Sequence, residues 1–176
     1  MTSRRPVYAC CQLRLGTDSM GSRKPALTSP GHETYSGRSM PLLAREDQGL
    51  FRLTLETLRV HVPVAYPVIV RTGGVDDTLD GFCVRRKSRF VIHLAERLSP
   101  KESPLVLIHE YAHAAAWSHM HDKACEELST GLLSDEDFED QVHDATFGIA
   151  YALCWRVFCR FALPQYESLA GEPRYY

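Results

Sequence analysis

One five-residue motif near the centre of the chain limits its fold and chemistry more than any other feature. His109, Glu110 and His113 read H-E-x-x-H and lie in an apolar segment, 105–117, with helical periodicity. Helical positions four apart are separated by ~40° around the axis and ~6 Å along it, so both imidazoles leave the same face. Two histidines placed in this way can bind one metal ion while the glutamate reaches its water, as in zinc hydrolases.

The alternative interpretation is an amphipathic helix that carries histidines by coincidence. The neighbouring residues Leu105, Val106, Ile108 and Ala112 argue against it, because they make the segment apolar. Imidazoles and a carboxylate in such a helix are costly to bury unless they have a partner. The motif and its surroundings therefore predict a zinc site in which Glu110 is the general base.

A catalytic zinc needs a third protein ligand, and the sequence leaves three kinds open. His119 follows at the spacing of the longer motif H-E-x-x-H-x-x-G-x-x-H, but Ala116 replaces its glycine and no methionine follows Met120 for a later Met-turn. His143 lies further along the chain. The other candidates are His121, Glu126, Glu127, Glu136 and Glu139.

Two segments together resemble the SprT-like zinc metallopeptidases. Residues 109–117 read HEYAHAAAW, and residues 143–152 read HDATFGIAYA. That family shows H-E-x-x-H-A with a nearby Trp, then His-Gly-x-x-(Trp/Phe) at the start of the last helix. Upstream, Gly81-Phe-Cys83 and 90–94 are similar to the family's strands before the active-site helix. The resemblance covers about residues 45–163.

This resemblance implies a zincin-like fold and zinc-dependent hydrolysis of peptide bonds in a protein or peptide substrate. It makes His109, His113 and His143 the zinc ligands and Glu110 the general base. The chain departs from the family in two respects: Asp144 replaces the usual glycine, and the segment between the second and third histidines is long and acidic. Asp144 can orient a ligand imidazole or cap the final helix, and Tyr151 is a candidate oxyanion donor.

Periodicity and turn residues predict a small α+β fold. An N-terminal helix over 41–62 is expected before a twisted sheet of three strands, which precedes the active-site helix, a helix that starts at Ser134 and a C-terminal helix that ends at Pro164. The active-site helix begins with a capping box at Ser99 or with a second start at Ser103. The expected strands and final helix span 67–72, 81–85, 89–94 and 143–163.

The strand over 89–94 is expected at the edge of the sheet beside the metal. An extended peptide could bind there by strand addition. His93, which alternates with Phe90 and Ile92, is expected to be a solvated histidine rather than a site residue.

Composition suggests one folded domain and a basic tail. Residues 1–45 carry a net charge of +5 within a total of −2, and 1–40 lack any apolar period, so we expect a disordered tail. The metallopeptidase domain should span 41–170, with a short C-terminal tail over 171–176. Met20 and Met40 are plausible alternative starts.

Neither a secretory signal nor an apolar run of about 18 residues is evident, so the expected location is cytoplasmic with no membrane span. The six cysteines form no C-x-x-C pair, which argues against a structural zinc ribbon and favours reduced thiols. Nucleic-acid association, known for some relatives, has no dedicated module here. The oligomeric state cannot be inferred from the sequence.

Two other functions remain open. One is a regulatory peptidase that cleaves a repressor-like partner, for which an acidic third ligand would be usual. The other is a non-catalytic binding domain stabilised by zinc, in which Glu110 would have no function.

Overall fold

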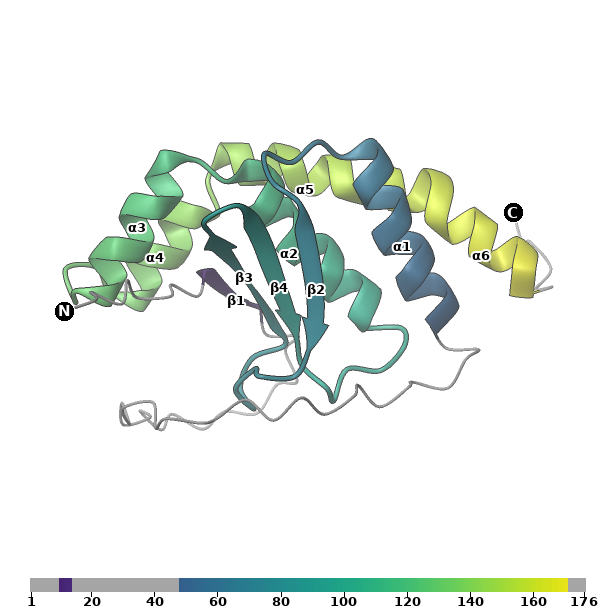
Figure 1. Ribbon diagram of the computed structural model, residues 1–176, viewed down its shortest axis with the longest axis horizontal. Coiled ribbons are helices and arrows are strands. Elements are labelled where there is room, and N and C mark those ends of the chain that lie inside the picture. The colour runs from purple at the N-terminus through teal and green to yellow at the C-terminus, as the bar shows by residue number, and fades with distance from the viewer. Residues whose placement is uncertain (1–9, 14–47, 171–176) are drawn as a thin grey trace.

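A computed structural model describes residues 10–13 and 48–170 of the chain, as an α+β fold (Figure 1). The mixed sheet has the strand order β1-β3-β4-β2, in which β2 runs parallel to β4 and the other neighbours are antiparallel. The predicted strands at 67–72, 81–85 and 89–94 are confirmed to within one residue. The strands are β1 (Cys10–Leu13), β2 (Val68–Thr72), β3 (Gly81–Arg86) and β4 (Arg89–Leu94).

The prediction that the strand over 89–94 is an edge strand is wrong. β4 pairs with β3 on one side and β2 on the other, so it lies inside the sheet. Phe90, Val91 and Ile92 are all buried, although consecutive residues point to opposite faces. A continuous apolar run of this kind is typical of a strand covered on both faces.

Part of the expected N-terminal tail belongs to the sheet. β1 pairs antiparallel with β3, and Cys10 lies opposite Cys83 in the register. This strand therefore departs from the prediction of a disordered tail over 1–40. The remaining residues of that tail, the start of the helix expected from 41, and the tail over 171–176 lie outside the described residues.

The helices cover one face of the sheet (Figure 1). α2 packs on β3 and β4, and both α1 and α5 pack on α2. The helices are α1 (Gln48–His61), α2 (Ser103–Ala116), α3 (His119–Ser129), α4 (Asp135–Val142), α5 (Ala145–Val157) and α6 (Leu163–Ala170), with a π-helical turn, η1 (Phe158–Ala162), between the last two.

Helix α2 lies at the centre of the core. Leu107, Ile108 and Tyr111 are completely buried, and burial of each of the two aliphatic side chains contributes about 1.5–3 kcal/mol. Gly81 lets β3 approach this helix closely, because a Cβ at that position would lie 2.8 Å from Val106 Cγ1. This close packing sets the distance between α2 and the sheet.

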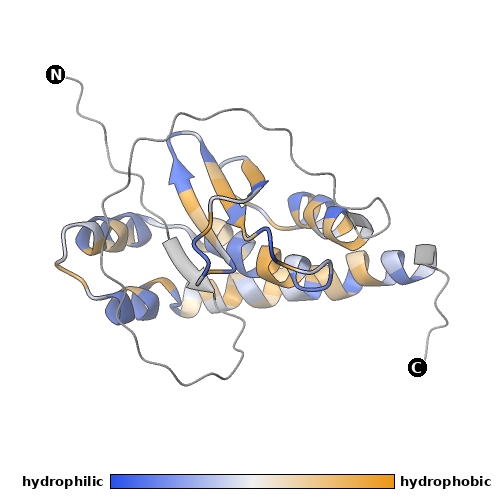
Figure 2. Cartoon of the chain, turned by 90° about the horizontal axis from the view of Figure 1, so that it is seen from below, coloured by the Kyte–Doolittle hydropathy of each residue, from blue (hydrophilic) through white to orange (hydrophobic). Residues whose placement is uncertain are grey.

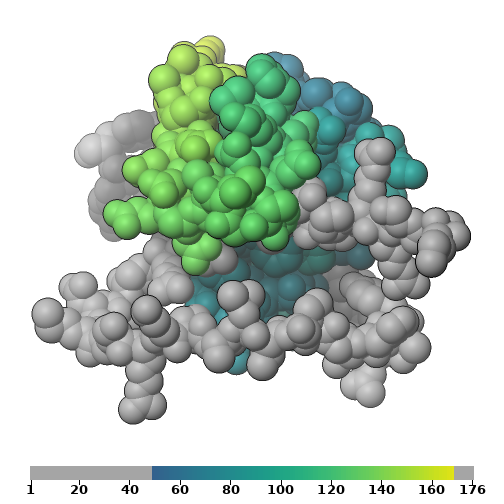
Figure 3. Space-filling model, turned by 90° about the vertical axis from the view of Figure 1, so that its left-hand side faces the viewer, coloured from purple at the N-terminus to yellow at the C-terminus, as the bar shows by residue number. Residues whose placement is uncertain are grey.

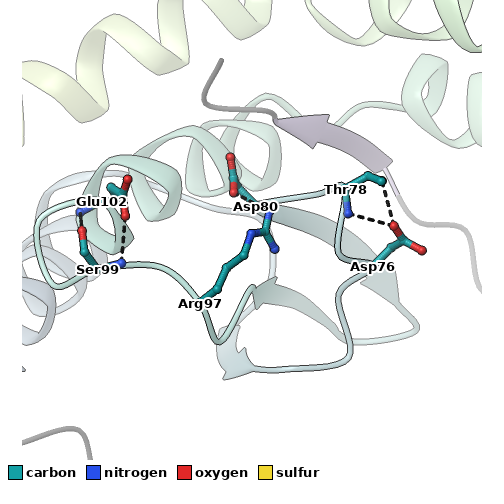
Figure 4. A network of polar contacts seen from close by, with 6 residues as sticks. All are labelled: Asp76, Thr78, Asp80, Arg97, Ser99 and Glu102. Atoms are coloured by element: carbon teal, nitrogen blue, oxygen red, sulfur yellow. Dashed lines mark hydrogen bonds and ion pairs between the residues drawn. The ribbon is translucent and has the colours of Figure 1, made fainter. Parts of the chain in front are cut away.

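Polar contacts hold the chain that leads into α2 (Figure 4). The Ser99 amide donates to Glu102 Oε2 at 2.9 Å, and the Glu102 amide donates to Ser99 Oγ at 3.3 Å. This is the predicted capping box, and the regular helix then begins at Ser103, the second predicted start. Arg97 forms an ion pair with Asp80 at 2.7 Å. This ion pair connects the loop before α2 to the residue that directly precedes β3.

The long acidic segment forms an antiparallel pair of helices, α3 and α4. Ser134 caps α4 by accepting from the Asp137 amide at 3.1 Å, which confirms the predicted start, and Gly131 makes the turn with φ +72°. The pair has a small core of its own, made by Ala124, Cys125, Phe138 and Val142. Its surface is largely hydrophilic (Figure 2), and the two helices lie together on one flank of the molecule (Figure 3).

The prediction that the last helix ends at Pro164 is wrong. The turn from Phe158 to Ala162 is π-helical, and α6 then continues to Ala170. Proline lacks an amide donor and its ring crowds the preceding turn, but it is tolerated in the first turn of a new helix. The change of helical pitch before Pro164 therefore lets the chain continue in the same direction.

The stretch Ala145–Ser168 is long and apolar enough, by length and composition alone, to cross a membrane. No apolar run of that length was expected from the sequence. The inner face of this helix carries Phe147, Cys154 and Val157, which are buried in the core. An apolar helix is therefore also what the packing of this domain requires.

Candidate metal centre

Helix α2 supplies three polar side chains to the interior of the protein. His109 is 7% exposed, while Glu110 and His113 are completely buried. The two histidines are one helical turn apart, and their Nε2 atoms lie 3.1 Å from each other. The predicted placement of both imidazoles on one face is confirmed.

His143 joins this pair from the end of α4. Its Nε2 lies 3.3 Å from His109 Nε2, and one ring nitrogen from each of His109, His113 and His143 lies within 4.8 Å of the others. Tetrahedral zinc with Zn–N bonds of ~2.05 Å separates its ligand nitrogens by about 3.3 Å. The two Nε2 separations therefore suit one ion bound by the three rings.

The rival third ligands lie elsewhere. His119 is exposed at the start of α3, as are Glu126 and Glu136 on their helices. His121 is buried but packs against Trp117, with ring centroids 5.5 Å apart. Within the described residues, the only group with metal-ligand geometry is that of His109, His113 and His143. The α3–α4 pair folds back on itself and thereby returns the chain to α2 at His143.

Glu139 orients the imidazole of His143. The ring Nδ1 lies 3.0 Å from the Glu139 carbonyl oxygen and 3.2 Å from its Oε2. Nδ1–H can donate to both oxygens, which makes Nε2 the ring nitrogen that would bind a metal. Glu139 was predicted only as a possible ligand; its spacing four residues before His143 on a helix is the signal for this second role.

Asp144 serves the backbone rather than a ligand. Its Oδ1 accepts from the Phe147 amide at 2.9 Å and caps α5. Of the two roles expected for this residue, the cap is the one that the geometry supports. The cap also fixes the direction in which α5 leaves His143.

The surroundings favour neutral imidazoles on α2. Burial, with a further effect of the His143 charge, lowers the pKa of His109 to about 4. Burial also lowers the pKa of His113 well below its ordinary value. At His143, burial lowers the pKa, but the hydrogen bonds and charge of Glu139 outweigh it, so that the pKa is raised. Metal ligation requires the neutral imidazole, which the two α2 histidines already hold at neutral pH.

Glu110 is a buried carboxyl group beside the histidines. Burial raises its pKa well above the ordinary value, and the opposing effects of His143 and of the Cys83 backbone are smaller. Neither carboxylate oxygen accepts a hydrogen bond of ordinary geometry. A buried ionisable group of this kind costs stability and is typical of a functional site.

Aromatic rings form the wall behind the histidines. Phe147 stacks on His113 with centroids 4.2 Å apart, and it packs edge-on against His143 at 4.5 Å. Tyr151 lies one turn further along α5, half-buried, with its ring 5.7 Å from that of His109. The role of Phe147 was not predicted, although its spacing four residues after His143 indicates it. The role of Tyr151 as an oxyanion donor stays a prediction.

His93 lies outside this centre, as expected, but it is not a solvated histidine. It is half-buried, its Nδ1 lies 3.3 Å from the Gly73 carbonyl oxygen, and its ring stacks on Phe82 at 4.7 Å. Being on an interior strand, it finds neighbours on β3. Where the structure describes cysteine side chains, Cys83, Cys154 and Cys159 are free thiols.

Comparison with protein-family models, with curated proteins and with solved structures gives no match for this chain. The geometry of its own residues is therefore what indicates the function of this protein.

Proposed function

We propose that this protein is a zinc-dependent metallopeptidase of the SprT-like type that acts on a protein or peptide substrate. The observation that carries the proposal is the convergence of three imidazole nitrogens beside a buried, unpaired carboxyl group. His109, His113 and His143 would hold the metal. Three protein ligands leave one position open, as is typical of catalytic rather than structural zinc.

When bound, zinc would lower the pKa of a coordinated water to about 7 and would polarise the substrate carbonyl. Glu110 would accept a proton from the attacking water and return it to the leaving amine. A carboxyl group whose pKa is raised by burial suits the first step, because it accepts a proton more readily than an exposed carboxylate does. Glu139 would keep Nε2 of His143 directed at the metal.

The two alternatives receive less support. A non-catalytic zinc domain would be expected to close the coordination sphere with a fourth protein ligand, and the described residues bring three together. A regulatory peptidase with an acidic third ligand would need a glutamate where His143 stands. A cytoplasmic location without membrane association is also part of the proposal. Association with nucleic acid rests on the family resemblance alone, without a dedicated module.

The test begins with zinc content per chain, by elemental analysis, of the parent protein and of His143→Ala, with His119→Ala as the matched control. One zinc in the parent and in His119→Ala, but not in His143→Ala, would support the three-histidine site. Hydrolysis of unfolded casein by the parent, lost in Glu110→Gln with zinc retained, would support the peptidase. Zinc retained in His143→Ala would refute the ligand set, and equal hydrolysis by Glu110→Gln would refute the mechanism.

A further inference from the structure

The strand β3 lies beside the candidate metal centre, and its outer hydrogen-bonding edge faces β1. α2 packs on β3, and the backbone of Cys83 contacts Glu110 closely enough to oppose the rise in pKa that burial causes there. Burial raises the pKa of the Cys83 thiol, and the charge of Glu110 adds to that rise. The middle of β3 therefore lies directly beside the proposed general base.

This edge is paired with a strand from the same chain. β1 runs antiparallel to β3, and the residue opposite Cys83 is Cys10. β1 also packs against α2 and against α4, the helix that leads to His143. Neighbouring strands are about 4.8 Å apart, so β1 occupies the position where an extended peptide would run past the site.

Charge favours the same placement. The α3–α4 pair, residues 119–142, carries eight acidic residues and one lysine, whereas residues 1–45 carry a net charge of +5. β1 itself is uncharged, belongs to the basic segment and contacts the acidic α4. A substrate that replaced β1 would meet the same acidic surface, so a basic extended peptide fits it best.

We propose that β1 is an internal pseudosubstrate that covers the β3 edge, where a basic, extended substrate peptide pairs with the protein. This inference rests on the proposed peptidase function. β1 must leave β3 before the substrate binds, so the apparent affinity for substrate is reduced by the fraction of molecules in which β1 is released. The strand thus limits activity by occupying the position of the substrate.

The test weakens β1 in the full chain. Consecutive amides of a strand point in opposite directions, so Cys11→Pro with Gln12→Pro removes at least one donor that faces β3. The same double change at Ser22 and Arg23, outside β1 but in the same segment, is the control. Both are made in the Glu110→Gln background, so that a probe peptide stays uncut.

The probe is a fluorescein-labelled peptide with the sequence of residues 7–16, and its binding to the zinc-loaded proteins is measured by fluorescence anisotropy. Release of a four-residue strand should tighten binding about tenfold in the β1 variant and leave the control unchanged. Equal binding by all three proteins would overturn the proposal. Weaker binding by the β1 variant, with its zinc content intact, would do the same, because β1 would then support the edge rather than cover it.

A second arm uses the register. Residues opposite each other in an antiparallel pair have Cα atoms about 4.5–5.5 Å apart, within the range for a disulfide. Diamide would accept two electrons and two protons from the Cys10 and Cys83 thiols, become its hydrazine and leave the disulfide. The locked protein should bind the probe at least about tenfold more weakly, dithiothreitol should reverse this, and Cys10→Ser should not respond. A mapped disulfide that leaves binding unchanged would overturn the proposal.

These readouts do not require hydrolysis. If the peptidase proposal fails, casein remains uncut while the peptide can still bind to the released edge. If the pseudosubstrate proposal fails, a chain that keeps Glu110 hydrolyses casein at the same rate with and without the two prolines in β1. The two failures are therefore distinguishable.

Discussion

Glu139 provides the sharpest test of the candidate centre, because it contacts a proposed ligand through two different atoms. Its carbonyl oxygen lies 3.0 Å from His143 Nδ1, and its carboxylate Oε2 lies 3.2 Å away. Glu139→Ala removes the carboxylate and keeps the backbone acceptor. Loss of such an outer partner weakens metal binding about 10–100-fold, and the retained carbonyl places the expected effect at the lower end.

We therefore expect zinc to bind Glu139→Ala about tenfold more weakly than the parent, which corresponds to about 1.4 kcal/mol. The assay is competition for zinc against a fluorescent chelator at fixed pH and ionic strength. Glu136→Ala is the control, because it removes an equal charge from an exposed position on the same helix. Equal weakening in both variants would attribute the effect to overall charge, and no weakening in either would refute the orienting role.

Three further predictions concern stability and reactivity. Glu110→Gln removes a buried carboxyl group that lacks a hydrogen-bond partner and whose ionised form burial disfavours, so urea unfolding of the metal-free protein should show a gain of about 1–3 kcal/mol. A lower stability would contradict this. Gly81→Ala should cost about 1–3 kcal/mol, because the new Cβ would lie 2.8 Å from an α2 side chain. Gly148→Ala, with no atom within 4 Å, should gain up to about 1 kcal/mol, and equal effects would refute the packing argument. Iodoacetamide at pH 8 should label the exposed Cys159 but spare Cys154, whose pKa burial raises to about 12, as peptide mass spectrometry would show.

The local features of the site could be predicted from the sequence because they depend on helical spacing. His109 and His113 are one turn apart on any regular helix, and the start of α4 at Ser134 follows from capping chemistry. The choice of His143 came from a resemblance rather than from spacing. Its approach to α2 depends on how α3 and α4 pack on each other, which periodicity does not specify.

The strand order could not be predicted from the sequence for a related reason. The apolar run Phe90–Ile92 indicates a strand buried on both faces, but it does not say which strands flank it. β2 joins the far side of β4 in parallel, so β4 lies inside the sheet and the edge strands are β1 and β2. The pairing of Cys10 with Cys83 links residues that are far apart in the sequence. Cys10 also belongs to a segment whose composition indicates disorder.

The positions of the three histidines along the chain have a consequence for local unfolding. Two of them are held side by side by one helix, whereas His143 comes close to them only when the α3–α4 pair is folded. A bound ion would thus close a loop of about 30 residues, for which the chain-entropy term is on the order of 3 kcal/mol. Metal binding and the opening of this helical pair would then be one linked equilibrium. Removing the metal should raise hydrogen exchange first in α3 and α4, while the amides of α2 stay protected.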